Sequence, residues 1–139
     1  MDTRAALAII LGVIAAAGDL RRCTIPNWLC VCGTASGFMW QAWTKGWSGA
    51  LTSGEGTLAG FGVFLIFYCL GGMGAGDVKL MAAFGALLGP SGILLAAVIT
   101  AMVGALIAMV CVLVKCRRST IPYAPAIVLG AWLALLAGR

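Results

Sequence analysis

Histidine is absent from the sequence, and charged residues of both signs are scarce. Soluble domains have about 25% charged residues, whereas this chain has 9%. So few charges cannot cover a surface that faces water, which excludes a soluble globular protein. The six cysteines form no C-x-x-C pair and have no histidine to join them, so the usual ligand patterns of a zinc site are missing. We therefore expect no metal site and no cofactor.

The residues that are present are mostly apolar. Hydrophobic residues make up 63% of the chain, and the mean hydropathy is +1.09. This composition predicts an integral membrane protein. With 139 residues and no long polar stretch, we expect residues 1–139 to form one compact helical domain. The cysteines then serve as small apolar filling.

The apolar residues fall into six segments, which predict an all-α bundle of about six transmembrane helices. The segments are 4–18, 27–43, 58–72, 78–88, 93–114 and 122–137. A spanning helix needs about 20 residues, so the fourth segment must begin near or before Asp77 or end inside the protein. We expect a short glycine-rich loop at 44–56 and a turn at 89–92.

The basic residues predict an orientation. With the N-terminus outside, six of them lie inside and three outside, which satisfies the positive-inside rule. The six are Arg21, Arg22, Lys79, Lys115, Arg117 and Arg118, and the three are Arg4, Lys45 and Arg139. This orientation places Asp19 and Asp77 together on the cytoplasmic side and the tryptophans at 40, 43 and 47 at the outer interface.

Asp19 and Asp77 are two of only four acidic residues, and each lies at the end of an apolar segment. Ionisable groups near the hydrocarbon are costly and usually functional. They are 58 positions apart, so only their shared membrane side allows them to meet. Two adjacent carboxyl groups hold one proton between them and can activate water for peptide hydrolysis. The alternative for Asp19 is an ion pair with Arg21 or Arg22.

The residues around these acids have functional and structural interpretations that remain open. Gly74 and Gly76 permit a substrate strand to approach the backbone closely, or they form a flexible loop. Lys79 pairs with Asp77, binds lipid phosphate or remains solvated. Asn27 caps a helix or binds substrate, with capping as the default.

Three motifs together resemble the type IV prepilin peptidases, a family of membrane aspartic proteases with a GxGD motif. They are Asp19 with Ile25-Pro26-Asn27, Gly74-Ala75-Gly76-Asp77-Val78-Lys79-Leu80, and Ile121-Pro122-Tyr123-Ala124-Pro125-Ala126. The resemblance covers essentially the whole chain. It implies that Asp19 and Asp77 are the catalytic pair. The residues expected to bind substrate or shape the site are Gly74, Gly76, Lys79, Pro26, Asn27, Pro122 and Pro125.

The resemblance also implies a substrate and a location. The family removes the short basic leader from prepilins and pseudopilins at the cytoplasmic face of the bacterial inner membrane. Longer members carry an insertion with paired C-x-x-C motifs and methylate the new N-terminus. This chain lacks that insertion, so we expect no methyltransferase activity, and its short form resembles the branch that serves tight-adherence (Flp) pili. The competing hypotheses are a small proton-coupled transporter and a non-catalytic pilus-assembly subunit.

Overall fold

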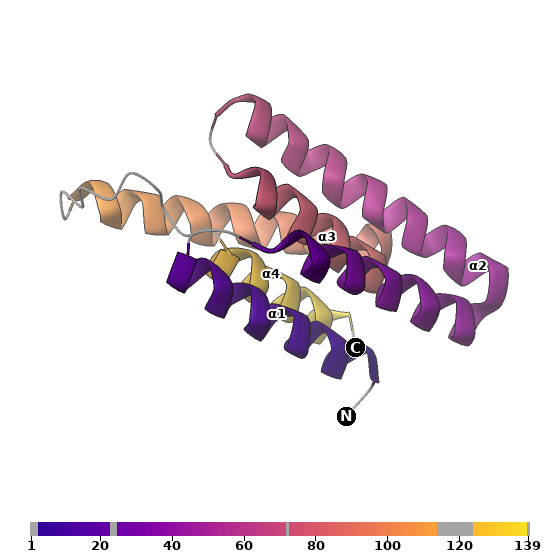
Figure 1. Cartoon of the computed structure of the whole chain (residues 1–139). Helices are drawn as coiled ribbons and strands as arrows, with labels where there is room; N and C mark the ends of the chain where they lie inside the picture. Colours follow the sequence, from indigo (N-terminus) through magenta and orange to yellow (C-terminus); the bar gives the residue numbers. More distant parts are fainter. Residues whose placement is uncertain (1–2, 23–24, 72, 114–123, 139) are drawn as a thin grey trace.

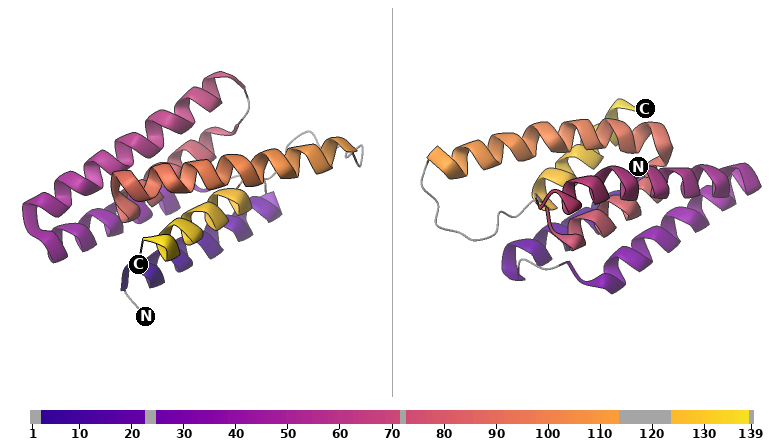
Figure 2. Two further views of the ribbon diagram at one scale, coloured as in Figure 1. Left: turned by 180° about the vertical axis from the view of Figure 1, so that it is seen from behind. Right: turned by 90° about the horizontal axis from the view of Figure 1, so that it is seen from above.

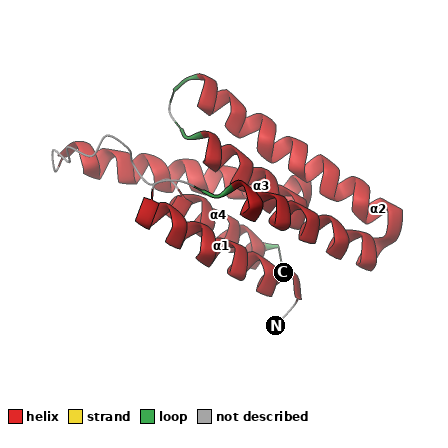
Figure 3. Cartoon of the chain, viewed as in Figure 1, coloured by secondary structure: helices red, strands yellow, loops and turns green. Residues whose placement is uncertain are grey.

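The computed structural model describes residues 3–22, 25–71, 73–113 and 124–138, and the regular structure of these residues is entirely helical (Figures 1 and 3). The helices are α1 (Thr3–Arg22), α2 (Asn27–Cys69), α3 (Ala75–Leu113) and α4 (Ala124–Ala137). Two stretches, Asn27–Cys69 and Ala75–Ile107, are long and apolar enough to cross a membrane. The all-α prediction is confirmed. The number of spans and the orientation remain predictions.

Helices α2 and α3 each contain one non-helical glycine at which the helix changes direction (Figures 1 and 2). A straight helix of 43 residues would be about 65 Å long, roughly twice the thickness of the bilayer core. Gly46 has φ 61° and ψ −142°, and Gly89 has φ 77° and ψ 179°. Side chains rarely tolerate such dihedrals, and Pro90 after Gly89 cannot donate a backbone hydrogen bond.

These two kinks lie inside the predicted loops but are much shorter than predicted. The sequence predicted a loop at 44–56 and a turn at 89–92, but both stretches are helical apart from Gly46 and Gly89. A single non-helical glycine is enough to redirect α2, and both halves of the helix then pack on the same part of α3. Gln41 Nε2, before the kink, and Ser53 Oγ, after it, both donate to the carbonyl oxygen of Ala86, at 3.3 and 2.9 Å.

The backbone at Gly89 predicts the effect of a small substitution. Its dihedral angles lie in a region that is essentially restricted to glycine, where other residues pay about 1–3 kcal/mol. We therefore expect Gly89→Ala to lower the free energy of unfolding by about that amount, measured by thermal unfolding in detergent. Gly54→Ala is the control, because a Cβ there would have a single contact, at 3.8 Å from Phe38. Equal stability of the two variants would contradict the dihedral argument.

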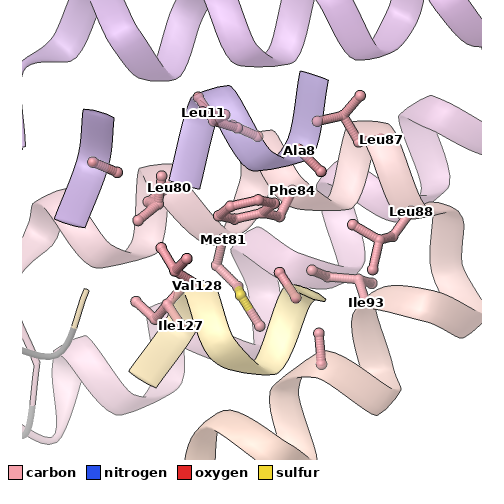
Figure 4. Packing of buried hydrophobic residues seen from close by; sticks show 14 of the residues in the cluster. Ala8, Leu11, Leu80, Met81, Phe84, Leu87, Leu88, Ile93, Ile127 and Val128 are labelled. Carbon is pink, nitrogen blue, oxygen red and sulfur yellow. The ribbon is translucent and has the colours of Figure 1, made fainter. Parts of the chain in front are cut away.

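The first half of α3, residues 75–88, forms the centre of the molecule. Five of its large side chains are at most 5% exposed: Leu80, Met81, Phe84, Leu87 and Leu88. Ala8 and Leu11 of α1 and Ile127 and Val128 of α4 pack around them (Figure 4). In a bilayer, close packing rather than removal from water holds helices together, so this tightly packed segment anchors the helices around it.

Contacts between α1 and α3 define the two ends of the bundle. The Arg4 guanidinium, at the start of α1, donates to the carbonyl oxygens of Leu87 and Leu88 at 2.9 and 2.8 Å. Arg4 lies at the beginning of α1, whereas Leu88 lies at the end of the first half of α3. Helix α1 and the first half of α3 therefore run in opposite directions. The end of α1 therefore lies beside the beginning of α3. Trp43 and Trp47, 92% and 81% exposed, flank the Gly46 kink at the opposite end.

Candidate active site

Asp19 lies in the last turn of α1 and is only 7% exposed. Its Oδ2 accepts a hydrogen bond of 3.2 Å from the backbone N–H of Ala124, the first residue of α4. The first N–H groups of a helix have no partner within the helix, and the N-terminal end favours negative charge. The carboxyl group of Asp19 therefore caps α4 across 105 positions of sequence.

Asp77 lies in the first turn of α3 and is also 7% exposed. Its Oδ2 accepts a hydrogen bond of 3.3 Å from the N–H of Gly74, just before the helix. The N–H of Asp77 donates back to the carbonyl oxygen of Gly74 at 3.1 Å. The side chain thus makes one half of a capping box. Capping does not prevent chemistry, because a carboxyl group has a second oxygen.

The two acids interact. The negative charge of Asp19 exerts a Coulombic repulsion on the carboxyl group of Asp77. Both are mostly shielded from water, and both are held by a backbone N–H at the beginning of a helix. The structure therefore places both acids at the same end of the bundle, within electrostatic range of each other. The side chains of Arg21 and Arg22, the alternative partners of Asp19, lie outside the described residues.

A sequence model of the type IV leader peptidase family matches residues 6–109. This range is well over half of the chain and contains both Asp19 and Asp77. The chain belongs to the type IV leader peptidase family. None of the curated proteins or solved structures that were compared matches the chain.

In this leader peptidase family member, Lys79 binds Asn27. Lys79 Nζ donates to Asn27 Oδ1 at 2.9 Å, on the exposed side of α3. Successive helix residues are about 100° apart, so Lys79 and Asp77 point to opposite sides. Pairing of Lys79 with Asp77, one of the three alternatives for this residue, is thus not seen. The default interpretation of Asn27 as a cap is wrong, because Pro26 is the N-cap residue of α2.

The glycines of the GxGD motif have different surroundings. Among the described residues, a Cβ on Gly74 would have Asp77 Oδ2 as its only neighbour within 4 Å, at 3.4 Å. A Cβ on Gly76 would lie 3.2 Å from the side chain of Ile25. Gly74 is therefore exposed beside the carboxyl group, whereas Gly76 allows the segment before α2 to pack on α3.

The remaining predicted site residues are prolines near helix starts. Pro26 has extended dihedrals, and its carbonyl oxygen accepts from the N–H of Leu29 at 3.1 Å. Pro125 is half-buried in the first turn of α4, where a missing N–H is tolerated. Pro122 lies outside the described residues. The described residues contain no group of three or more side chains that could hold a metal ion.

Sequence reasoning missed the contribution of Ala124. The motif around Pro122 and Pro125 indicated a helix start, but no local signal connects it to Asp19. Alanine has no polar side chain, so its N–H is invisible to a search for functional residues. Only the packing of α4 on α1 reveals it, where Trp132 Nε1 also donates to the carbonyl oxygen of Ala8 at 3.1 Å.

Proposed function

We propose that this protein is an aspartic prepilin leader peptidase. The observation that supports this most is the interacting, buried pair of Asp19 and Asp77 at one end of the bundle. Two such carboxyl groups can share one proton, so that one acts as a base and the other as an acid. The membrane-spanning composition and the family of the chain indicate a substrate at the membrane.

The reaction follows from these two groups. The ionised carboxylate removes a proton from a water molecule, and the water oxygen attacks the carbonyl carbon of the scissile peptide bond. The protonated carboxyl group donates its proton to the carbonyl oxygen as negative charge develops there. Collapse of the tetrahedral intermediate breaks the C–N bond. The amine leaves with the proton that the base took from water, and a hydroxyl group of the intermediate returns its proton to the other carboxylate, so the pair again holds one proton. Each acid–base role contributes a rate factor of about 10²–10⁴.

The surrounding backbone holds the pair in position. The N–H groups of Ala124 and Gly74 each fix one oxygen of a carboxyl group. The N-terminal ends of α4 and α3 also favour one negative charge on the pair. The second oxygen of each group is then directed to water and substrate.

The proposed substrates are prepilins and pseudopilins, in particular those of Flp-type pili, and the proposed site of cleavage is the cytoplasmic face of the inner membrane. Six helical segments with the N-terminus outside would put both acids on that face. Lys79, which lies in the same turn region as Asp77, belongs to the basic residues expected there. Gly74, exposed beside Asp77, leaves room for a substrate strand.

The test is cleavage by the purified protein. We expect the full chain in detergent or liposomes to cut a prepilin once, between leader and stem, and mass spectrometry of both fragments identifies the bond. An uncut prepilin under conditions that keep the protein folded would refute the proposal. A transporter would instead produce a proton-driven flux in liposomes. The position of both acids at helix ends favours hydrolysis over transport.

The shared proton predicts the pH dependence of cleavage. At low pH both carboxyl groups are protonated and no base remains, and at high pH both are ionised and no acid remains. We expect kcat/KM to pass through a maximum and to fall on both sides. The measurement is an initial-rate series with a fixed peptide across pH. A rate that rises to a plateau without an alkaline fall would contradict the acid role of the second carboxyl group.

A further inference from the structure

The first half of α3 ends at Gly89, where three other helical segments contact its free carbonyl groups. The last four carbonyl groups of a helix have no partner within it, and Pro90 has no N–H to donate to them. Side chains of the neighbouring segments supply the missing donors. Gln41 and Ser53, from the two halves of α2, donate to the carbonyl oxygen of Ala86. The third segment is α1.

Arg4, in the first turn of α1, supplies the donors for the last two of these carbonyl groups. Its Nε and Nη2 donate to the carbonyl oxygens of Leu87 and Leu88 at 2.9 and 2.8 Å. The guanidinium carbon lies 5.8 Å from the ring centre of Trp40, within the range of a cation–π interaction. Trp40 Nε1 in turn donates to the hydroxyl of Thr3 at 2.7 Å. Arg4 is therefore held in one position by α2 and α3 together.

The chemistry of arginine suits this position. An arginine near the end of a membrane helix normally extends to water or to lipid headgroups, whereas Arg4 is half-buried and binds the backbone of a neighbouring helix. Its positive charge is favourable there, because the C-terminal end of a helix carries partial negative charge. The planar guanidinium also directs two N–H groups at two acceptors in a fixed geometry, which an ammonium group cannot do. The contact therefore fixes where α1 lies along α3.

Arg4 is the direct polar link between the two helices that carry the acids. Among the residues that the structure describes, the other hydrogen bonds from α1 to neighbouring helices run to α2 and α4. Ala8 accepts from Trp132 and Asp19 accepts from Ala124, both of α4. The remaining contacts between α1 and the first half of α3 are apolar, and apolar contacts are non-directional. The position of α1 along α3 therefore depends on Arg4.

We propose that Arg4 is a positioning residue that sets the separation of the two catalytic acids from the opposite end of the bundle. Asp19 lies 15 positions after Arg4 on α1, and Asp77 lies 11 positions before Leu88 on α3. Helix α1 is helical throughout Thr3–Arg22, so a displacement of its first turn along α3 is transmitted to its last turn. This inference depends on the proposed function, because the separation of the acids matters only if they share a proton.

The first experiment separates kcat from KM with a prepilin peptide. Arg4→Met keeps an unbranched side chain but removes both donors. We expect kcat to fall by about 10- to 100-fold, because a misplacement of about 1 Å can cost about 10²-fold in rate. KM should stay unchanged, because Arg4 lies at the opposite end of the bundle from the acids. Arg4→Lys keeps the charge without the planar pair of donors, so its kcat should lie between the two, and it carries the same tests if Arg4→Met does not fold.

Gln41→Met is the matched control. Gln41 donates to carbonyl groups at the same end of α3 as Arg4 does, so its replacement should also lower the unfolding temperature. It lies on α2, however, which carries neither acid. We therefore expect kcat of the folded Gln41→Met protein to equal that of the unaltered protein.

The shape of the pH profile separates positioning from a loss of folded protein. Repulsion between two neighbouring carboxyl groups holds the acid and alkaline limbs of the profile apart. In Arg4→Met the acids are displaced from each other, so the two limbs should lie closer together than in the unaltered protein. A variant that only contains less folded protein would lower the rate equally at every pH and keep the spacing of the limbs.

Hydrogen–deuterium exchange tests the displacement without any substrate. The carboxyl group of Asp19 protects the N–H of Ala124 across the interface between α1 and α4, whereas that of Asp77 protects the N–H of Gly74 three positions away. We expect Arg4→Met to speed exchange at Ala124 and to leave Gly74 unchanged. Gln41→Met should leave both unchanged.

An unchanged kcat in folded Arg4→Met, or a lower kcat with unchanged spacing of the limbs, would overturn the inference. So would an Ala124 N–H that exchanges as slowly as in the unaltered protein. In each case an active unaltered protein that Asp77→Asn inactivates leaves the proposed function intact. A failure of the unaltered protein to cleave refutes the proposed function instead, and exchange at Ala124 then still decides whether Arg4 positions Asp19.

Discussion

Replacement of Asp19 or Asp77 by alanine is expected to reduce leader cleavage by at least about 10²–10⁴-fold, the contribution of one acid–base role. Each variant removes one of the two groups that must hold and transfer the proton. The double variant should lose little more than either single variant, because the two groups act as a unit. The measurement is the rate of conversion of a prepilin peptide to its two fragments.

The controls separate chemistry from stability. Both acids cap helices, so alanine at either position also removes a hydrogen bond to a backbone N–H. Asp19→Asn and Asp77→Asn keep an oxygen that accepts this hydrogen bond but cannot act as a base, so we expect them to be folded and inactive. Glu55→Ala removes an exposed acid of α2 and should leave the rate unchanged. Leader removal by either alanine variant at the normal rate would refute the paired-acid assignment.

Replacement of Gly85 by leucine is expected to cause a large loss of stability. A Cβ on Gly85 would collide with the carbonyl oxygen of Gly56, and a Cβ on Gly56 would collide with that of Gly85. The obstacles are backbone atoms of α2 and α3, which cannot rotate away as a side chain can. Overpacking usually costs about 1–3 kcal/mol and occasionally more, and we expect Gly85→Leu to reach or exceed the upper end of that range. Thermal unfolding in detergent measures the loss.

Gly62→Leu is the matched control on α2. A Cβ there would have no neighbour within 4 Å in the part of the chain that the structure describes, so the free energy of unfolding should change by no more than about 0.5 kcal/mol. If Gly85→Leu unfolded at the same temperature as Gly62→Leu, the close approach of α2 and α3 at this point would be contradicted. The comparison also tests the packing around the catalytic end, because α3 carries Asp77.

Several features of the fold follow from local sequence. The apolar segments predict helices, because a backbone in the membrane must satisfy its own hydrogen bonds and these segments approach the length of a spanning helix. Small residues recur at four-residue spacing, as in Gly12/Ala16 and Gly130/Ala134, which predicts close helix packing. Gly12 and Gly130 do lie against neighbouring helices, at Val128 of α4 and Ala96 of α3. The helix is interrupted inside both predicted loops, at Gly46 and Gly89, but the loops were predicted too long because glycine-rich stretches are typical of loops.

The candidate site also has features that the sequence predicts and features that only the fold reveals. Asp19 and Asp77 stand out in the sequence because acids are rare in so apolar a chain. The backbone N–H groups that these two carboxyl groups accept from lie at very different distances along the chain, however. Gly74 is three positions from Asp77, within the reach of a local motif, whereas Ala124 is 105 positions from Asp19.

By itself, therefore, the sequence determined the membrane-like composition, the helical segments and the identity of the two acids. These depend on residue type and near-neighbour spacing, which the chain carries before it folds. The tertiary structure alone decided that Asp19 caps α4 and that Lys79 turns away from Asp77 to bind Asn27. The physical reason is that such contacts arise only when segments far apart along the chain pack around the buried first half of α3, and no local pattern specifies which of their atoms will meet.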